Sequence, residues 1–191
     1  MNAPRSTRTR ATRPVGLLLT VGVAAGLGAC GPSGADVPEG FVQVGSGRLE
    51  VAVPQGWVPV EGDSELWPGG WADAELDDAQ HLLIVSPEFG TGGADLGRST
   101  FVAGAQIGGV TGYTSDGFSE PVQTDSLEIA RNDFTYTGPD GERYEGIFWA
   151  AADPRSGDTV ALQLTGSELP ADLVDGIEGS IRLGDGADDP A

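Results

Sequence analysis

The last third of the sequence places two short turn signals between strand-like segments, which constrains the fold more than any other feature. Arg143 to Ala151 is rich in aromatic and β-branched residues, and Asp158 to Thr165 alternates between apolar and polar residues. Two turn sequences, Gly138 to Gly141 and Asp153 to Gly157, bound these segments. Turns this short join antiparallel neighbours. We therefore expect an antiparallel meander over the last third of the chain.

The segment before this meander changes the parity of its alternation. Leu127 and Ile129 share one parity, whereas Phe134 and Tyr136 share the other. A strand that buries one face cannot change parity without a bulge or a turn. The sequence therefore predicts such an irregularity at Arg131-Asn132-Asp133.

Two further segments are predicted to be helices. The first is Leu96 to Gly108, with Asp95 as its expected N-cap. The second follows Ser167, which is expected to cap it, with Pro170 in its first turn. Its apolar residues recur every fourth position and form one stripe that should pack on the sheet: Leu169, Leu173, Ile177 and Ile181. The stretch from Gly109 to Thr124 is expected to be a loop.

Strands are also expected in the first half of the chain. Arg48 to Val53 alternates before Pro54, and His81 to Ser86 contains an uninterrupted apolar run that suits a central strand. The expected fold class is therefore α+β, an antiparallel sheet meander with one mid-chain helix and a C-terminal helix packed on it.

The N-terminal 29 residues have the composition of a secretory signal peptide. Met1 to Pro14 carries four arginines and no acid, and Val15 to Ala29 is an apolar stretch of 15 residues. A permanent membrane span needs about 20 apolar residues, so this stretch is too short. We expect residues 1–29 to be a signal peptide, 30–40 a flexible tether, 41–183 the folded domain and 184–191 a disordered acidic tail.

The end of this leader, Leu27-Gly28-Ala29-Cys30, resembles the lipobox of bacterial lipoproteins. The resemblance implies cleavage before Cys30 and a diacylglycerol on its sulfur. The alternative is an ordinary signal peptide that happens to contain a cysteine. Cys30 is the only cysteine and has no disulfide partner in the chain. With the lipobox, the absence of lysine and the abundance of glycine and alanine indicate an actinobacterial source.

Net charge limits the partners of the mature chain. It keeps six arginines and no lysine against 29 acidic residues, a net charge of −23. Nucleic acid is excluded as a partner, because phosphate binding needs clustered basic residues. The acidity indicates either capture of cations or basic partners, or simply a solvated surface that keeps the protein soluble.

Catalytic and cofactor motifs are not found in the sequence. There is one histidine, His81, at the start of an apolar strand, and no Gly-x-Ser-x-Gly motif. One cysteine and one histidine cannot form a zinc site. Asp140-Gly141-Glu142 and Asp153 to Asp158 are interpreted as hairpin turns rather than calcium loops. We expect no catalytic residue, no cofactor and no metal.

One pair of aromatic residues is a candidate contact site. Trp67 and Trp71 flank Pro68-Gly69-Gly70 in a segment without a clear strand pattern. Exposed aromatic rings on a loop suit contact with a sugar, a lipid or a peptide. The alternative is that both rings fold back onto the core.

The order of elements resembles the Mog1/PsbP-like fold, which small actinobacterial lipoproteins of the LpqN type share. The resemblance covers Phe41 to Leu183, and its most recognisable piece is Val53-Pro54-Gln55-Gly56-Trp57 near the start. It implies a mostly non-enzymatic module that binds a partner, and it supplies no catalytic residues to carry over.

These observations predict a lipoprotein held on the extracytoplasmic face of the cell membrane by lipid on Cys30. Its domain is predicted to bind an envelope protein, a lipid or a glycan without catalysis. An extracytoplasmic hydrolase with a carboxylate-based site is the alternative. A spacer without a ligand is a third hypothesis, and it predicts no apolar groove beside Trp67 or Trp71.

Overall fold

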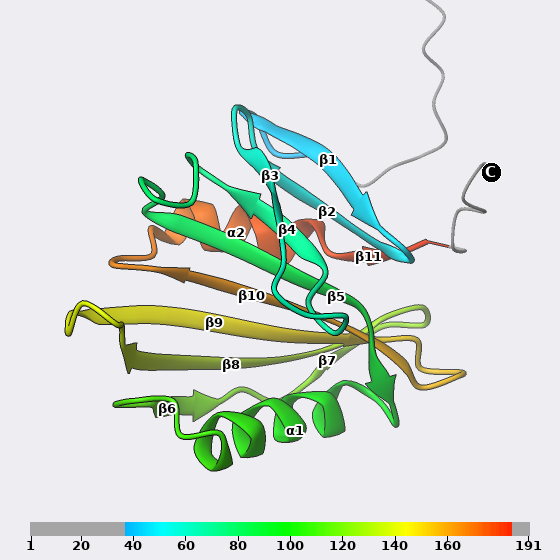
Figure 1. Cartoon of the computed structure of the whole chain (residues 1–191). Coiled ribbons are helices and arrows are strands. Elements are labelled where there is room, and N and C mark those ends of the chain that lie inside the picture. The colour runs from blue at the N-terminus through cyan, green and yellow to red at the C-terminus, as the bar shows by residue number, and fades with distance from the viewer. Residues whose placement is uncertain (1–36, 185–191) are drawn as a thin grey trace, which may run out of the picture. The chain divides into compact units, whose positions relative to one another are not determined.

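The computed structural model describes residues 37–184, which form two antiparallel sheets (Figure 1). The larger sheet has the strand order β3 (Val58–Glu61), β4 (Gly69–Ala72), β5 (His81–Thr91), β10 (Asp158–Gly166), β9 (Arg143–Ala152), β8 (Glu128–Thr137) and β6 (Thr114–Phe118), and β7 (Val122–Gln123) also pairs with β8. The smaller sheet has the order β1 (Phe41–Ser46), β2 (Leu49–Pro54) and β11 (Arg182–Leu183).

Two helices cover opposite faces of the larger sheet: α1 (Ala94–Ile107) and α2 (Ala171–Ser180) (Figure 1). The side chains of β9 alternate between them. Trp149 packs in one core cluster with Ile177 of α2 and with residues of β2. Phe148 packs in a second cluster that contains Ala94 of α1. The expected α+β class, an antiparallel meander with a mid-chain and a C-terminal helix, is confirmed.

Several sequence expectations fall on residues outside the described range. They are the leader 1–29, the lipid attachment at Cys30, the tether up to residue 36 and the tail from residue 185. Among residues 37–184, the first strand begins at Phe41 and the last ends at Leu183. No helix in this range is both long and apolar enough to cross a membrane.

The predicted irregularity at Arg131-Asn132-Asp133 is wrong. β8 pairs with β9 in unbroken register from Glu128 opposite Ala152 to Thr137 opposite Arg143. The parity changes because both faces of the sheet are buried, so no bulge is needed. Ile129 packs against the α2 side and Phe134 against the α1 side.

The start of the C-terminal helix also differs from the prediction. α2 begins at Ala171, and Pro170 occupies the N-cap position without a side-chain hydrogen bond. Ser167 is exposed and lies before the helix. The backbone N–H of Leu169 instead donates to the Glu145 carboxylate at 3.1 Å. The predicted apolar stripe does pack in the α2-side cluster: Leu169, Leu173, Ile177 and Ile181.

Two further differences lie around α1. The helix begins at Ala94, so the N-cap is Gly93 and not the predicted Asp95. Gly93 has φ 93°, a conformation that favours glycine. The expected loop from Gly109 to Thr124 contains β6 and β7. Most residues of these two strands are exposed, so they lack the apolar alternation by which a strand is recognised in sequence.

A polar node fixes α2 to the sheet. The indole N–H of the fully buried Trp149 donates to the Glu178 carboxylate at 2.8 Å. The Arg131 guanidinium contacts the same Glu178 oxygen at 2.7 Å and also pairs with Asp133. A buried indole N–H that loses its acceptor is costly, so Glu178 holds the helix in register with β8 and β9.

His81 and Asp73 close the connection between β4 and β5. The His81 Nδ1 lies 2.8 Å from the Asp73 carboxylate, and its Nε2 lies 3.0 Å from the backbone oxygen of Glu168. Burial acts to raise the pKa of Asp73, but hydrogen bonds from His81 and from the backbone N–H of Gln80 outweigh it and lower the pKa.

Replacing Glu178 with alanine should reduce the free energy of unfolding by about 1–3 kcal/mol, because the Trp149 N–H then has no acceptor. Chemical denaturation followed by tryptophan fluorescence measures this. Glu178→Gln, which keeps an acceptor oxygen, should lose less of the free energy of unfolding than Glu178→Ala. Asp175→Ala, an exposed position on the same helix, is the control. Equal losses for Glu178→Ala and Asp175→Ala would contradict the assignment.

Asp73→Asn should destabilise the fold by up to about 1 kcal/mol near neutral pH. A carboxyl whose pKa is lowered on folding stabilises above its unfolded pKa, about 3.9, and loses that contribution as pH falls through the folded value. The stability difference between wild type and Asp73→Asn should therefore shrink below about pH 4. Denaturation curves from neutral to acidic pH measure it. A difference that persists undiminished at the acidic end would contradict the pairing.

Candidate functional site

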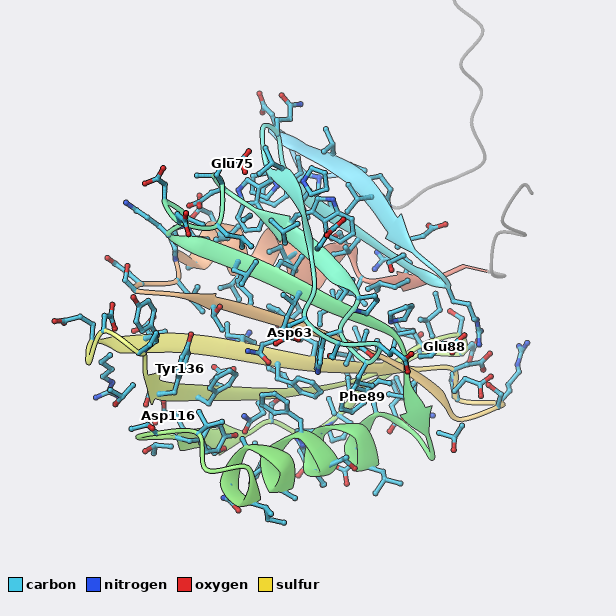
Figure 2. The ribbon with its side chains drawn as sticks, viewed as in Figure 1. Asp63, Glu75, Glu88, Phe89, Asp116 and Tyr136 are labelled. Carbon is cyan, nitrogen blue, oxygen red and sulfur yellow. The ribbon has the colours of Figure 1, made fainter. Side chains whose placement is uncertain are left out.

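An aromatic pocket lies between α1, the adjoining face of the larger sheet and the connection between β3 and β4. Its volume is about 520 Å³, within the range of small-molecule sites. Six aromatic residues from five different segments line it: Trp67, Phe89, Phe101, Tyr113, Phe134 and Tyr136. Figure 2 labels two of them, Phe89 on β5 and Tyr136 on β8.

The floor of the pocket is built from rings that are fixed by packing. Phe101 of α1 stacks on the buried Phe148 of β9 with ring centroids 4.0 Å apart. Phe134 of β8 lies over Gly146, its cross-strand partner on β9. A Cβ atom at position 146 would come within 2.2 Å of the Phe134 ring, so only glycine leaves room for it. These contacts set the rings before any ligand arrives.

Trp67 forms one wall of the pocket. The β3–β4 connection carries it, and its backbone N–H donates to the Ser64 hydroxyl at 3.2 Å. Its ring centroid lies 5.7 Å from that of Phe89. The ring is half-buried, so part of its surface faces the pocket.

Trp71 lies elsewhere. It belongs to β4, opposite Leu83 of β5, and it packs against the α2-side core cluster. The interpretation that the two tryptophans sit together on a loop is therefore wrong. β4 begins at Gly69, so Trp71 is a strand residue that packs against the α2-side cluster, whereas Trp67 lies in the connection before the strand. An apolar pocket opens beside Trp67.

The polar groups of the pocket are uncharged. They are the side chains of Thr100 and Gln163 and the hydroxyls of Tyr113 and Tyr136. Burial raises the pKa of both tyrosines. A hydrogen bond from Asn132 at 3.2 Å partly offsets this for Tyr113. Both phenols therefore remain neutral at physiological pH.

The lining contributed by α1 is also uncharged. Between Leu96 and Ser115 the sequence has a single charged residue, Arg98. This side chain is buried and does not line the pocket. It pairs with Asp95, donates to the Ser119 backbone oxygen at 2.6 Å and lies 4.8 Å from the Phe118 ring centroid. No side chain that lines the pocket carries a charge at neutral pH.

The other candidate side chains, His81, Asp140 and Asp153, form hydrogen bonds within turns and between neighbouring segments. Both ring nitrogens of His81 face oxygen acceptors, so neither is free to act as a base. Asp140 accepts from the Tyr144 hydroxyl at 2.7 Å, and Asp153 accepts from the Arg155 backbone N–H at 2.8 Å. Within residues 37–184, no three potential metal-ligating side chains gather in one place.

Sequence reasoning found one residue of the pocket, Trp67, and missed the other five rings. Two signals were available. Phe134 and Tyr136 share a parity that faces away from the α2 side. The stretch from Leu96 to Ser115, in which Arg98 is the single charged residue, stands out in a chain that is 20% charged. Neither signal reveals that Phe89 of β5 joins these rings, because that contact depends on strand order.

Comparison with known proteins supports the fold. The solution structure of cyanobacterial PsbP (CyanoP) from Synechocystis sp. PCC 6803 matches with a TM-score of 0.55 and 18% identity, over 82% of this chain and 98% of that one. At that identity, the likeness is one of fold, the expected PsbP-like architecture.

Two other solved structures match with lower TM-scores. LpqN, involved in cell envelope biogenesis of Mycobacterium tuberculosis, matches with a TM-score of 0.43 and 17% identity, over 75% of this chain and 90% of that one. A structure from Bacteroides thetaiotaomicron VPI-5482 has a TM-score of 0.41 and 12% identity, over 71% and 45%. No family model and no curated protein sequence matches the chain.

Proposed function

We propose that this protein is a lipid-anchored binding protein of the cell envelope, and that its domain holds an apolar part of its ligand in the aromatic pocket. The observation that carries the proposal is the pocket itself. Five of its six rings are only half-buried, and apolar surface left in contact with water is unfavourable at about 25 cal/mol per Å². A ligand that covers these rings recovers that free energy.

The chemistry of the lining favours binding over hydrolysis. Hydrolysis by paired carboxylates needs two acids that face one substrate, and no acidic residue lines the aromatic pocket. An apolar pocket with a few neutral polar groups is typical of a site that recognises and holds a ligand.

Attachment to the extracytoplasmic face of the membrane is proposed from the sequence. The leader ends at a lipobox, and Cys30 is the only cysteine. The first described strand begins at Phe41, so Cys30 precedes it by a segment rich in glycine and proline that suits a tether. Two acyl chains suffice for stable anchoring.

Filling the pocket from the helix side tests ligand binding. Gly104 lines the pocket, and a Cβ atom there meets nothing within 4 Å. Gly104→Leu should keep the fold, since leucine favours helices over glycine by about 0.5–1 kcal/mol. It should weaken uptake of Nile red, an uncharged apolar dye, at least about five-fold.

The matched control is Gly179→Leu. Gly179 is an exposed position of α2 that likewise has nothing within 4 Å of its added Cβ, and it does not line the aromatic pocket. The dye should bind this variant as it binds the wild type. If both variants take up the dye equally well, the pocket is not the binding site.

The anchor has a direct test. Cys30→Ser should abolish incorporation of a labelled fatty acid, and the protein should leave the membrane fraction or retain its leader. Ser33→Ala, in the adjacent tether, is the control and should be labelled normally. A Cys30→Ser protein that is still labelled and membrane-bound would refute the proposal.

A further inference from the structure

We infer that the aromatic pocket selects a hydrophobic organic cation, a ligand with a quaternary or otherwise weakly hydrated ammonium group joined to an apolar body. The inference rests on the proposed binding function and names the chemical class of ligand. Three features carry it: the number of rings, the neutrality of the lining and the excess of negative charge around the pocket.

The rings supply the attraction for the positive group. The face of an aromatic ring carries partial negative charge, and a cation within about 6 Å of its centroid is attracted, most strongly to tryptophan. Trp67 and Phe89 stand on one part of the lining, and Phe101, Phe134 and Tyr136 on another. Successive ring centroids in each group lie 5.4–6.1 Å apart. A cation in the pocket therefore lies among several aromatic rings.

The lining offers this cation no competing charge. It contains no basic side chain, and both tyrosines remain neutral. It contains no carboxylate either, which distinguishes it from a site for a small, strongly hydrated ammonium such as that of lysine, because burying such a group requires a paired charge. A quaternary ammonium carries its charge within apolar groups and suits an aromatic cage.

The surroundings of the pocket are negative. The β3–β4 connection that carries Leu66 and Trp67 also carries the exposed acids Asp63 and Glu65, and Figure 2 labels Asp63 on this connection. At the other end, the Asp140 carboxylate acts on the Tyr136 phenol electrostatically. With a net charge of −23 on the mature chain, the field favours cations and disfavours anions.

Three of the six arginines in the described residues are paired with acidic side chains. Among the described residues, Arg48 pairs with Asp153 and Asp158, and Arg98 pairs with Asp95. Arg131 pairs with Asp133 and Glu178.

The remaining lining accounts for the apolar body of the ligand. Leu66 of the β3–β4 connection and Ala105 and Val110 near the end of α1 complete the lining. A pocket of about 520 Å³ exceeds what a bare tetramethylammonium group fills. A ligand that is only a small cation leaves apolar surface uncovered, and one that is only apolar gains nothing from the field.

A pair of probes that differ only in charge separates these cases. Phenyltrimethylammonium and tert-butylbenzene have the same shape, with a positive nitrogen in one and a carbon in the other. The mature chain with Cys30→Ser contains every described helix and strand and is used without detergent. By calorimetry at low salt, the cation should bind about ten-fold more tightly than the hydrocarbon. Added salt should weaken binding of the cation only.

Two variants test the source of the preference. The double variant Asp63→Asn with Glu65→Gln should weaken binding of the cation about two- to three-fold and leave binding of the hydrocarbon unchanged. Glu50→Gln with Asp172→Asn removes the same charge from β2 and α2, elements that cover the other face of the sheet, and should have a smaller effect. Gly104→Leu should reduce binding of both probes.

The outcomes distinguish this inference from the proposed function. Equal affinity for the two probes would overturn the inference alone, as would a protein that takes up Nile red but not the cation. If neither probe nor the dye binds, the proposed function is wrong as well.

Discussion

Burial of β9 on both of its faces is the constraint on which the rest of the structure depends. Every residue from Gly146 to Ala152 is buried, and the strand pairs with β8 on one side and β10 on the other. Because its side chains alternate between two faces, each face needs its own cover. The small sheet and α2 supply one cover, and α1 supplies the other.

The two covers are built differently, and the difference creates the pocket. Near the start of α1, Gly97 lies close to the sheet. A Cβ atom added at Gly97 would be 3.0 Å from the Cβ of Ala150 and 3.0 Å from the γ-methyl of Thr159. Small residues on both sides bring helix and sheet into contact there. Toward the end of α1 the sheet presents Phe134 and Tyr136, while the helix presents Gly104 and Ala105. Beyond Phe101, these small helix residues leave the space in front of the sheet rings open.

The sequence was sufficient for the architecture but not for the site. The alternation of Asp158 to Thr165 and the adjacent turns predict the meander, because they depend only on local spacing. The helix start at Ser167 was wrong because Pro170 and the contact of Leu169 with Glu145 delay it. The bulge expected in β8 was wrong because the pattern was interpreted for a sheet with one buried face. The residues that line the pocket are spread from Leu66 to Gln163 in the sequence, and no local pattern predicts that they lie close together.

The pocket also bears on the choice between a spacer and a binding protein. Apolar surface left in contact with water contributes no hydrophobic stabilisation, so a domain under no functional demand would gain by filling such a hollow. A larger side chain at Gly104 could enter it without a clash, and the helix would be the more stable for losing a glycine. Both filling the hollow and the helix propensity therefore favour a larger residue than glycine at position 104. A glycine beside half-exposed rings is what the proposed binding function expects, because a ligand would provide the missing cover.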